Sequence, residues 1–223
     1  MGTIRLDMTM SLDGYVTGPD DGPDEPMGVG GFRLFNWLDR RDDPSPSGDV
    51  YDEMLATRAI IAGRRTYELA GHWNGDHHHG VPILVLTHDV PAGPPPGTVR
   101  FVTDVAECAA LAREAVGDGV AMVHGARAGQ ALLGAGELDE LELHVVPVLL
   151  GRGRRLFDHL GPGHVELDLL RQVRTPEVED PARQVLHLRY RVRSGRRPAA
   201  AQVRAGPARG RSAPADRRRV ADG

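Results

Sequence analysis

Residues 120–151 of the chain read VAMVHGARAGQALLGAGELDELELHVVPVLLG. The first four predict a short buried strand, and the small residues Gly125 and Ala126 predict a turn. A helix is expected over 127–133 and a second strand over 141–148. Small residues between a strand and a helix let a phosphate group approach backbone N–H groups at the positive end of the helix dipole. We therefore interpret this turn as the pyrophosphate site of a dinucleotide, and the second strand as one wall of the substrate site.

Two further apolar runs end in polar residues. Residues 59–62 and 81–87 predict buried strands, and the first of them leads into a helix. Because strand ends and helix starts of an open α/β sheet share one edge, all three junctions are expected at the edge where ligands bind. Guanidinium and hydroxyl groups suit a phosphate ligand, although a solvated helix start would have the same composition. The residues at these two junctions are Gly63, Arg64, Arg65, Thr66, Thr87 and His88.

The rest of the pattern extends the alternation of helices and strands. Further strands are expected over 3–10, 99–103, 165–175 and 184–192, the last two as an antiparallel pair. Further helices are expected over 32–38, 49–56 and 105–116. Asp104 is a favourable N-cap for the third of these helices, and the single cysteine, Cys108, lies on it at a position predicted to be buried.

Three loops allow two interpretations each. The acidic, glycine-flanked loop 18–24 is either a mobile lid or a solvated connector. The loop 72–79 contains three consecutive histidines, but adjacent side chains diverge, so a solvated loop is favoured over a metal site. The arginine-rich turn 151–157 either binds a substrate phosphate or is a charged surface loop.

Composition excludes several classes of protein. The chain of 223 residues is 40% hydrophobic, contains one cysteine and no lysine, and has a net charge of −4. A catalytic lysine and a disulfide framework are therefore excluded, and a cytoplasmic location is expected. Residues 194–223 hold eight Arg and two Asp and almost no large apolar residue, so they predict a disordered tail after one domain over 1–193. That domain has a net charge of −10, which argues against nucleic acid as its partner.

Several sequence blocks occur together in an order that resembles a known family. They are Ser11-Leu-Asp-Gly-Tyr15, Ala62-Gly-Arg-Arg-Thr-Tyr-Glu68, Val85-Leu-Thr-His88, His124-Gly-Ala126 and the stretch from Gly136 to Asp158. The pattern resembles the dihydrofolate reductase family, and more closely its branch similar to the C-terminal reductase domain of the bifunctional riboflavin-biosynthesis deaminase/reductase. This resemblance implies a three-layer αβα fold, with a mixed, mostly parallel eight-stranded sheet and a C-terminal antiparallel hairpin. It also implies NADPH, hydride transfer and often a homodimer.

The resemblance assigns roles residue by residue. The cofactor phosphates would be met by Gly63, Arg64, Arg65 and Thr66, and its pyrophosphate by Gly125, Ala126, Arg127 and Ala128. The adenosine ribose and its 2′-phosphate would lie by Thr87 and His88, and the nicotinamide and mobile loop by Asp13 and Gly14. Candidate substrate contacts are Trp37, Pro147 and Arg152. His144 would lie beside the substrate ring.

One departure from the family concerns the proton donor. The helix carboxylate that dihydrofolate reductases use falls at Ser47 in this chain, with Asp49 and Asp52 nearby. Asp49 and His144 are therefore the candidate catalytic residues, with a bound water as the alternative. The sequence favours an NADPH-dependent reductase of a small heterocyclic or imine-like substrate, pterin- or pyrimidine-derived and without a metal. The alternative is a non-catalytic nucleotide-binding or regulatory protein that retains the cofactor cleft.

Overall fold

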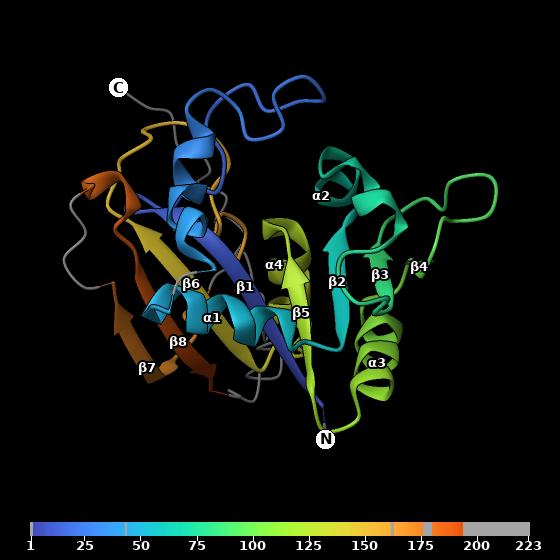
Figure 1. Ribbon diagram of the computed structural model, residues 1–223. Coiled ribbons are helices and arrows are strands. Elements are labelled where there is room, and N and C mark those ends of the chain that lie inside the picture. The colour runs from blue at the N-terminus through green and yellow to red at the C-terminus, as the bar shows by residue number, and fades with distance from the viewer. Residues whose placement is uncertain (1, 43, 162, 176–179, 194–223) are drawn as a thin grey trace, which may run out of the picture.

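The computed structural model describes residues 2–42, 44–161, 163–175 and 180–193, so the predicted tail from residue 194 lies outside the described residues. Its centre is an eight-stranded sheet in the order β4-β3-β2-β5-β1-β6-β8-β7 (Figure 1). The strands are β1 (Thr3–Ser11), β2 (Ala59–Gly63), β3 (Ile83–Leu86), β4 (Val99–Val102), β5 (Val120–His124), β6 (Glu140–Val146), β7 (Leu167–Arg174) and β8 (Leu186–Val192). All pairs from β4 to β6 are parallel, whereas β8 is antiparallel to β6 and β7. The predicted mixed sheet with a C-terminal antiparallel hairpin is confirmed.

Helices cover both faces of this sheet. The alternation of side chains along β2 shows the two faces, because Ile61 packs with α3 (Val105–Val116) and α4 (Ala126–Ala135), whereas Ile60 packs on the opposite side. The opposite face carries α1 (Pro46–Leu55) and the 3-10 helix η1 (Gly31–Arg40), which lie in front of the central strands in Figure 1. The short α2 (Arg64–Leu69), η2 (Gly71–Gly75) and η3 (Pro181–Arg183) complete the chain. No helix of the described residues is long and apolar enough to span a membrane.

Local interactions explain where the predicted helices begin. Asp104 accepts a hydrogen bond from the backbone N–H of Glu107 at 2.7 Å, and α3 has the predicted bounds. The helix predicted over 49–56 begins earlier, because Ser45 accepts from the N–H of Gly48 at 3.2 Å and a proline follows the cap. The helix predicted over 32–38 is the 3-10 helix η1.

An ion-pair cluster around the buried Glu142 fastens α1 to the antiparallel end of the sheet. Glu53 of α1 accepts from Arg171 of β7 at 2.5 Å and from Arg189 of β8 at 2.6 Å. The same two guanidinium groups donate to Glu142 of β6, whose side chain is 1% exposed. This four-residue cluster holds α1 against the strands β6, β8 and β7, and so positions the polar residues described below.

Candidate active site

The first two predicted junctions meet at the carboxyl ends of β2 and β5. Gly125 has a φ of +100°, and a Cβ on it would lie 2.4 Å from Oγ1 of Thr66 at the start of α2. A Cβ on Gly63 would lie 3.8 Å from the Cβ of Ala128 in α4. The starts of α2 and α4 are therefore adjacent, and only glycine fits the turn at 125 without strain. Ala126 is the first residue of α4, where a side chain is accommodated.

The third junction, after β3, lies beside the first two. Gly63 is paired with Leu86, so Thr87 follows directly at the same edge. Thr87 is buried, and its hydroxyl donates to the carbonyl of Asp89 at 2.9 Å, a carbonyl that also accepts from Nη1 of Arg64 at 3.1 Å. His88 and Arg127 are exposed. The predicted convergence of the three strand ends is thus present in the structure.

The loop that precedes η1 reaches across to α2 (Figure 1). The carboxylate of Asp21 accepts from Nε of Arg65 at 3.0 Å and from Nε of Arg154 at 2.7 Å, while the Asp21 side chain is only 8% exposed. Burial acts to raise the pKa of Asp21, but hydrogen bonds and charge from the two arginines hold it below its usual range. We call this contact the arginine clasp. It joins the loop to α2 and to the arginine-rich turn.

The arginine-rich turn and the predicted nicotinamide border contact each other. Asp13 accepts from the N–H groups of Leu150 and Gly151 at 3.1 and 2.7 Å, and a hydrogen bond from Ser11, together with these two, lowers the pKa of Asp13. Arg155 lies 4.5 Å from the centre of the Tyr15 ring. Gly14 has a φ of +86°, with open space where a side chain would stand. Arg152 is exposed.

A row of polar side chains lies beneath η1 and α1. Nε2 of His144 lies 3.1 Å from the carboxylate of Asp7, and Nδ1 of His144 lies 2.7 Å from Nδ1 of His187. Nε2 of His187 lies 3.2 Å from the hydroxyl of Ser47 in α1. Every member is less than 9% exposed, and the ring of Trp37 packs against both imidazoles, with ring centres 4.8 and 5.1 Å apart. We call Asp7, His144, His187 and Ser47 the buried polar row.

Burial and mutual charge set the ionisation of this row. Burial, the neighbouring His144 and the Arg171 guanidinium lower the pKa of His187 to about 3. Burial acts to raise the pKa of Asp7, but the charge of His144 and its hydrogen bond lower it overall. His124, on the adjacent strand β5, also faces Asp7, and burial lowers the pKa of His124. Asp7 and His187 are not among the residues that the sequence singles out.

The two predicted proton donors lie in different surroundings. Asp49 is exposed in the first turn of α1, and its carboxylate is not part of the buried polar row. His144 is within the row and is 1% exposed. Ser47, which the sequence resemblance aligns with a helix carboxylate, contacts His187. The catalytic roles of Asp49 and His144 stay predictions.

The loop with three histidines differs from the solvated loop that the sequence favours. His78 is 8% exposed, and its Nε2 lies 3.0 Å from the carbonyl of Thr57. His77 stacks on His124 with ring centres 5.1 Å apart. That prediction was wrong for these two side chains, because the loop packs against Thr57, which precedes β2, and against His124, at the end of β5.

Pro147 lies in a different place from the buried polar row. It lines an apolar groove of about 340 Å³ together with Leu12, Val145, Arg174, Thr175, Gln184, Val185 and Leu186. Consecutive strand residues point to opposite faces, so Val145 turns toward this groove and His144 toward the row. Pro147 lines this groove, whereas Trp37 is buried against the polar row, and the substrate roles predicted for both stay predictions.

Comparison with known proteins gives a likeness in structure alone. No family model and no curated protein matches the sequence. A protein from Shewanella sp. PV-4, described as a riboflavin biosynthesis protein, superimposes with a TM-score of 0.59 at 20% identity over 85% of this chain and 98% of its own. Dihydrofolate reductase from Enterococcus faecalis, complexed with NADP(H) and RAB-propyl, gives 0.58 at 14% identity over 86% and 96%. The chain therefore has the dihydrofolate reductase fold.

Proposed function

We propose that the protein is an NADPH-dependent reductase that transfers a hydride to a small heterocyclic or imine-like substrate, pterin- or pyrimidine-derived. The observation that carries this proposal is the convergence of three strand-to-helix or strand-to-loop junctions on one edge of the sheet. Helix N-termini and guanidinium groups gathered at one edge bind phosphate groups well. The likeness to a dihydrofolate reductase complexed with NADP(H) supports the same assignment.

The cofactor would be held by backbone and side chains of the three junctions. Gly125 and the N-terminal turn of α4 would receive the pyrophosphate, because the glycine leaves backbone N–H groups accessible. Arg64 and Thr87, which share the carbonyl of Asp89, would lie by the 2′-phosphate. When bound, NADPH supplies the hydride, and the protein supplies orientation and electrostatics.

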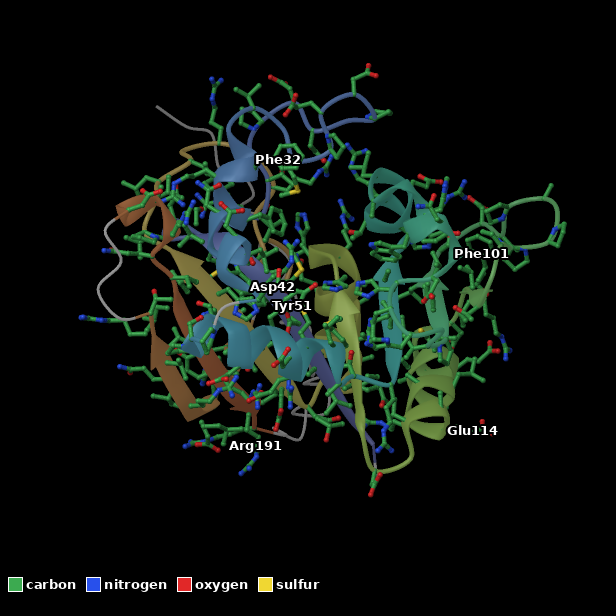
Figure 2. The ribbon with its side chains drawn as sticks, in the orientation of Figure 1. Phe32, Asp42, Tyr51, Phe101, Glu114 and Arg191 are labelled. Carbon is green, nitrogen blue, oxygen red and sulfur yellow. The ribbon has the colours of Figure 1, made fainter. Side chains whose placement is uncertain are left out.

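An aromatic surface supports a planar heterocycle as the substrate. Phe32 and Phe35 are 57% and 36% exposed and lie three residues apart on η1, so they share one side of a 3-10 helix. Figure 2 shows Phe32 at the end of η1 that adjoins the long loop. Exposed aromatic rings favour stacking with a flat ring system. The apolar pattern of η1 is typical of a core or of a pocket wall. Among its large apolar side chains, the structure fully buries only Leu34 and Trp37.

The test of the cofactor assignment is a titration with NADPH and NADH, followed by nucleotide fluorescence. Arg64→Ala is expected to weaken NADPH about 10- to 100-fold, the cost of one charged hydrogen bond, and to leave NADH nearly unchanged. Arg100→Ala is the control, because Arg100 is exposed and pairs with Glu107 away from the junctions. Equal weakening of both nucleotides by Arg64→Ala would contradict the phosphate assignment.

The second candidate function is a nucleotide-binding protein without turnover. The exposure of Asp49 favours it, together with the serine that stands where the family has a helix carboxylate. Saturable NADPH binding without NADPH oxidation, measured with 7,8-dihydrofolate, ribosylaminopyrimidines and menadione as acceptors, would establish this candidate and exclude the reductase.

A further inference from the structure

The proposed reduction consumes a proton as well as a hydride, and the helix α1 does not present a carboxylate to the buried polar row. Asp49 and Asp52 of that helix are both exposed. Asp7 of β1 is the buried carboxylate of the row, and it stands beside His144. We propose that Asp7 and His144 together hold the proton that the reaction consumes, and that His187 and Ser47 position them. This inference rests on the proposed function.

The distances in the row, together with an ionised Asp7, assign each hydrogen to one atom. With Asp7 ionised, Nε2–H of His144 donates to the carboxylate, and Nδ1 of the same ring accepts. Only one hydrogen fits between the two Nδ1 atoms, 2.7 Å apart, so His187 donates there through Nδ1–H. Nε2 of His187 then accepts from the hydroxyl of Ser47. With both imidazole rings neutral, all three hydrogen bonds of the row therefore point from Ser47 toward Asp7.

One added proton reverses part of this chain, and every ring nitrogen of the two histidines keeps a partner. His144 becomes an imidazolium that donates to Asp7 through Nε2–H and to His187 through Nδ1–H. His187 then carries its hydrogen on Nε2 and donates to the oxygen of Ser47. The two states differ by a single proton. The row can therefore take up and give back one proton with little movement of heavy atoms.

Asp7 is the end of the row that lies beside β5, whose carboxyl end leads into the turn at Gly125. The Asp7 side chain keeps a slight exposure, whereas that of His144 is almost fully buried. Leu6 is paired with Val123, which places Asp7 next to His124 and one residue short of the turn at Gly125. The proton passes through Asp7 to the nitrogen of a C=N bond while its carbon takes the hydride from NADPH. The double bond becomes single, NADPH becomes NADP⁺, and water returns a proton to the pair.

Charges from every neighbouring element bear on this pair. The charged and titratable groups that face Asp7 are Arg5 on β1, Glu142 on β6, His124 on β5 and His77 in the loop after η2. Arg171 of β7 faces His187, and both it and Arg189 neutralise Glu142. The covering helices contribute the neutral groups Trp37 and Ser47, with Glu53 held by the same two arginines. Glu142 and Glu53 are thus paired with arginines, whereas Asp7 is paired with His144.

The chain of hydrogens can be tested without any substrate. Nuclear magnetic resonance on protein labelled with ¹⁵N-histidine reports which ring nitrogen carries hydrogen. At pH 8 we expect His144 as the Nε2–H form and His187 as the Nδ1–H form. The opposite tautomers would overturn the proposed chain.

The proton role is tested by NADPH oxidation with 7,8-dihydrofolate across pH 5 to 9. Asp7→Asn is expected to lower kcat about 100-fold or more and to change the pH profile, with NADPH affinity preserved. Glu140→Gln removes another carboxylate from the same strand pair, the partner of Arg5 at 2.9 Å, and should leave the pH profile unchanged. His187→Asn keeps a hydrogen-bond donor for Nδ1 of His144 and should retain the pH profile of the unaltered protein. His187→Leu removes that donor and should change the pH profile.

The outcomes separate this inference from the proposed function. Absence of NADPH binding by the unaltered protein, or binding without reduction of any acceptor, would overturn the reductase function and the proton role together. Reduction that proceeds in Asp7→Asn with the original rate and pH profile would overturn the proton role alone. A folded Asp7→Asn protein that binds NADPH and reduces its acceptor 100-fold more slowly would support both.

Discussion

Gly125 is the residue on which the proposed cofactor site depends. Its φ is +100°, and an added Cβ would lie only 2.4 Å from Oγ1 of Thr66. The turn therefore has no room for a side chain. Gly125→Ala should introduce strain of a few kcal/mol, which moves α2 away from α4 and lowers the unfolding midpoint. The same movement should weaken NADPH binding by about 10-fold or more. Thermal unfolding and nucleotide titration measure the two effects.

Gly134→Ala is the matched control for that substitution. Gly134 lies within α4, and a Cβ there would meet open space. Replacing an unstrained helical glycine with alanine stabilises a protein by roughly 0.5–1 kcal/mol. Gly134→Ala should thus raise the unfolding midpoint with NADPH affinity unchanged. If Gly125→Ala behaves in the same way, the steric interpretation of the turn is wrong.

The loop before η1 is the element whose behaviour the arginine clasp controls. Asp21→Asn removes the negative charge that Arg65 and Arg154 share, so the loop should exchange amide hydrogens faster over 18–30. NADPH should bind more tightly, because a phosphate no longer competes with a carboxylate for Arg65. Hydrogen exchange and nucleotide titration measure these changes. Asp24→Asn, on an exposed residue of the same loop, should change neither, and slower exchange in Asp21→Asn would refute the clasp.

Elements with strong local signals are predictable from the sequence. The helix α3 has its predicted bounds because Asp104 caps it, and the strand pair β7–β8 follows from alternation and turn residues. The buried polar row is not predictable in this way. Alternation along β1 predicts one buried and one solvated face, yet Asp7 and Thr9 are buried, because η1 and α1 cover the second face. No periodicity in the sequence encodes which helix returns over a strand, so His187, 140 residues from Ser47, could not be placed beside it.

At the scale of the whole molecule, buried histidines make stability depend on pH. The pKa values of His77 and His187 are about 3 in the folded protein, chiefly through burial, compared with about 6.5 in an unfolded chain. Between those values the unfolded state binds more protons, so stability is complete above pH 6.5 and falls as the pH drops toward 3. In this range each of the two histidines should lower the free energy of unfolding by up to about 1.4 kcal/mol for each unit that the pH falls.

Urea unfolding at pH 7.5 and pH 5 measures this loss. At pH 5 the two residues together should lower the free energy of unfolding by about 4 kcal/mol at most. His187→Asn, which cannot titrate, should show about half of that pH dependence. A free energy of unfolding that is flat between pH 7.5 and 5 would contradict the depressed pKa values. The lowered pKa values of Asp7 and Asp21 add a further loss only below pH 4, where unfolded carboxylates become protonated.

The arginine clasp also determines how the protein responds to chemical labelling. The chain contains no lysine, so amine-directed reagents find no side chain to modify, whereas dicarbonyl reagents such as phenylglyoxal condense with guanidinium groups. Arg65 and Arg154 are each nearly half exposed on either side of Asp21. Adducts on these two arginines would remove both of the ion pairs that hold Asp21, and so would release the loop from α2. Mass spectrometry of the labelled peptides could then follow, residue by residue, how a bound nucleotide shields this edge from the reagent.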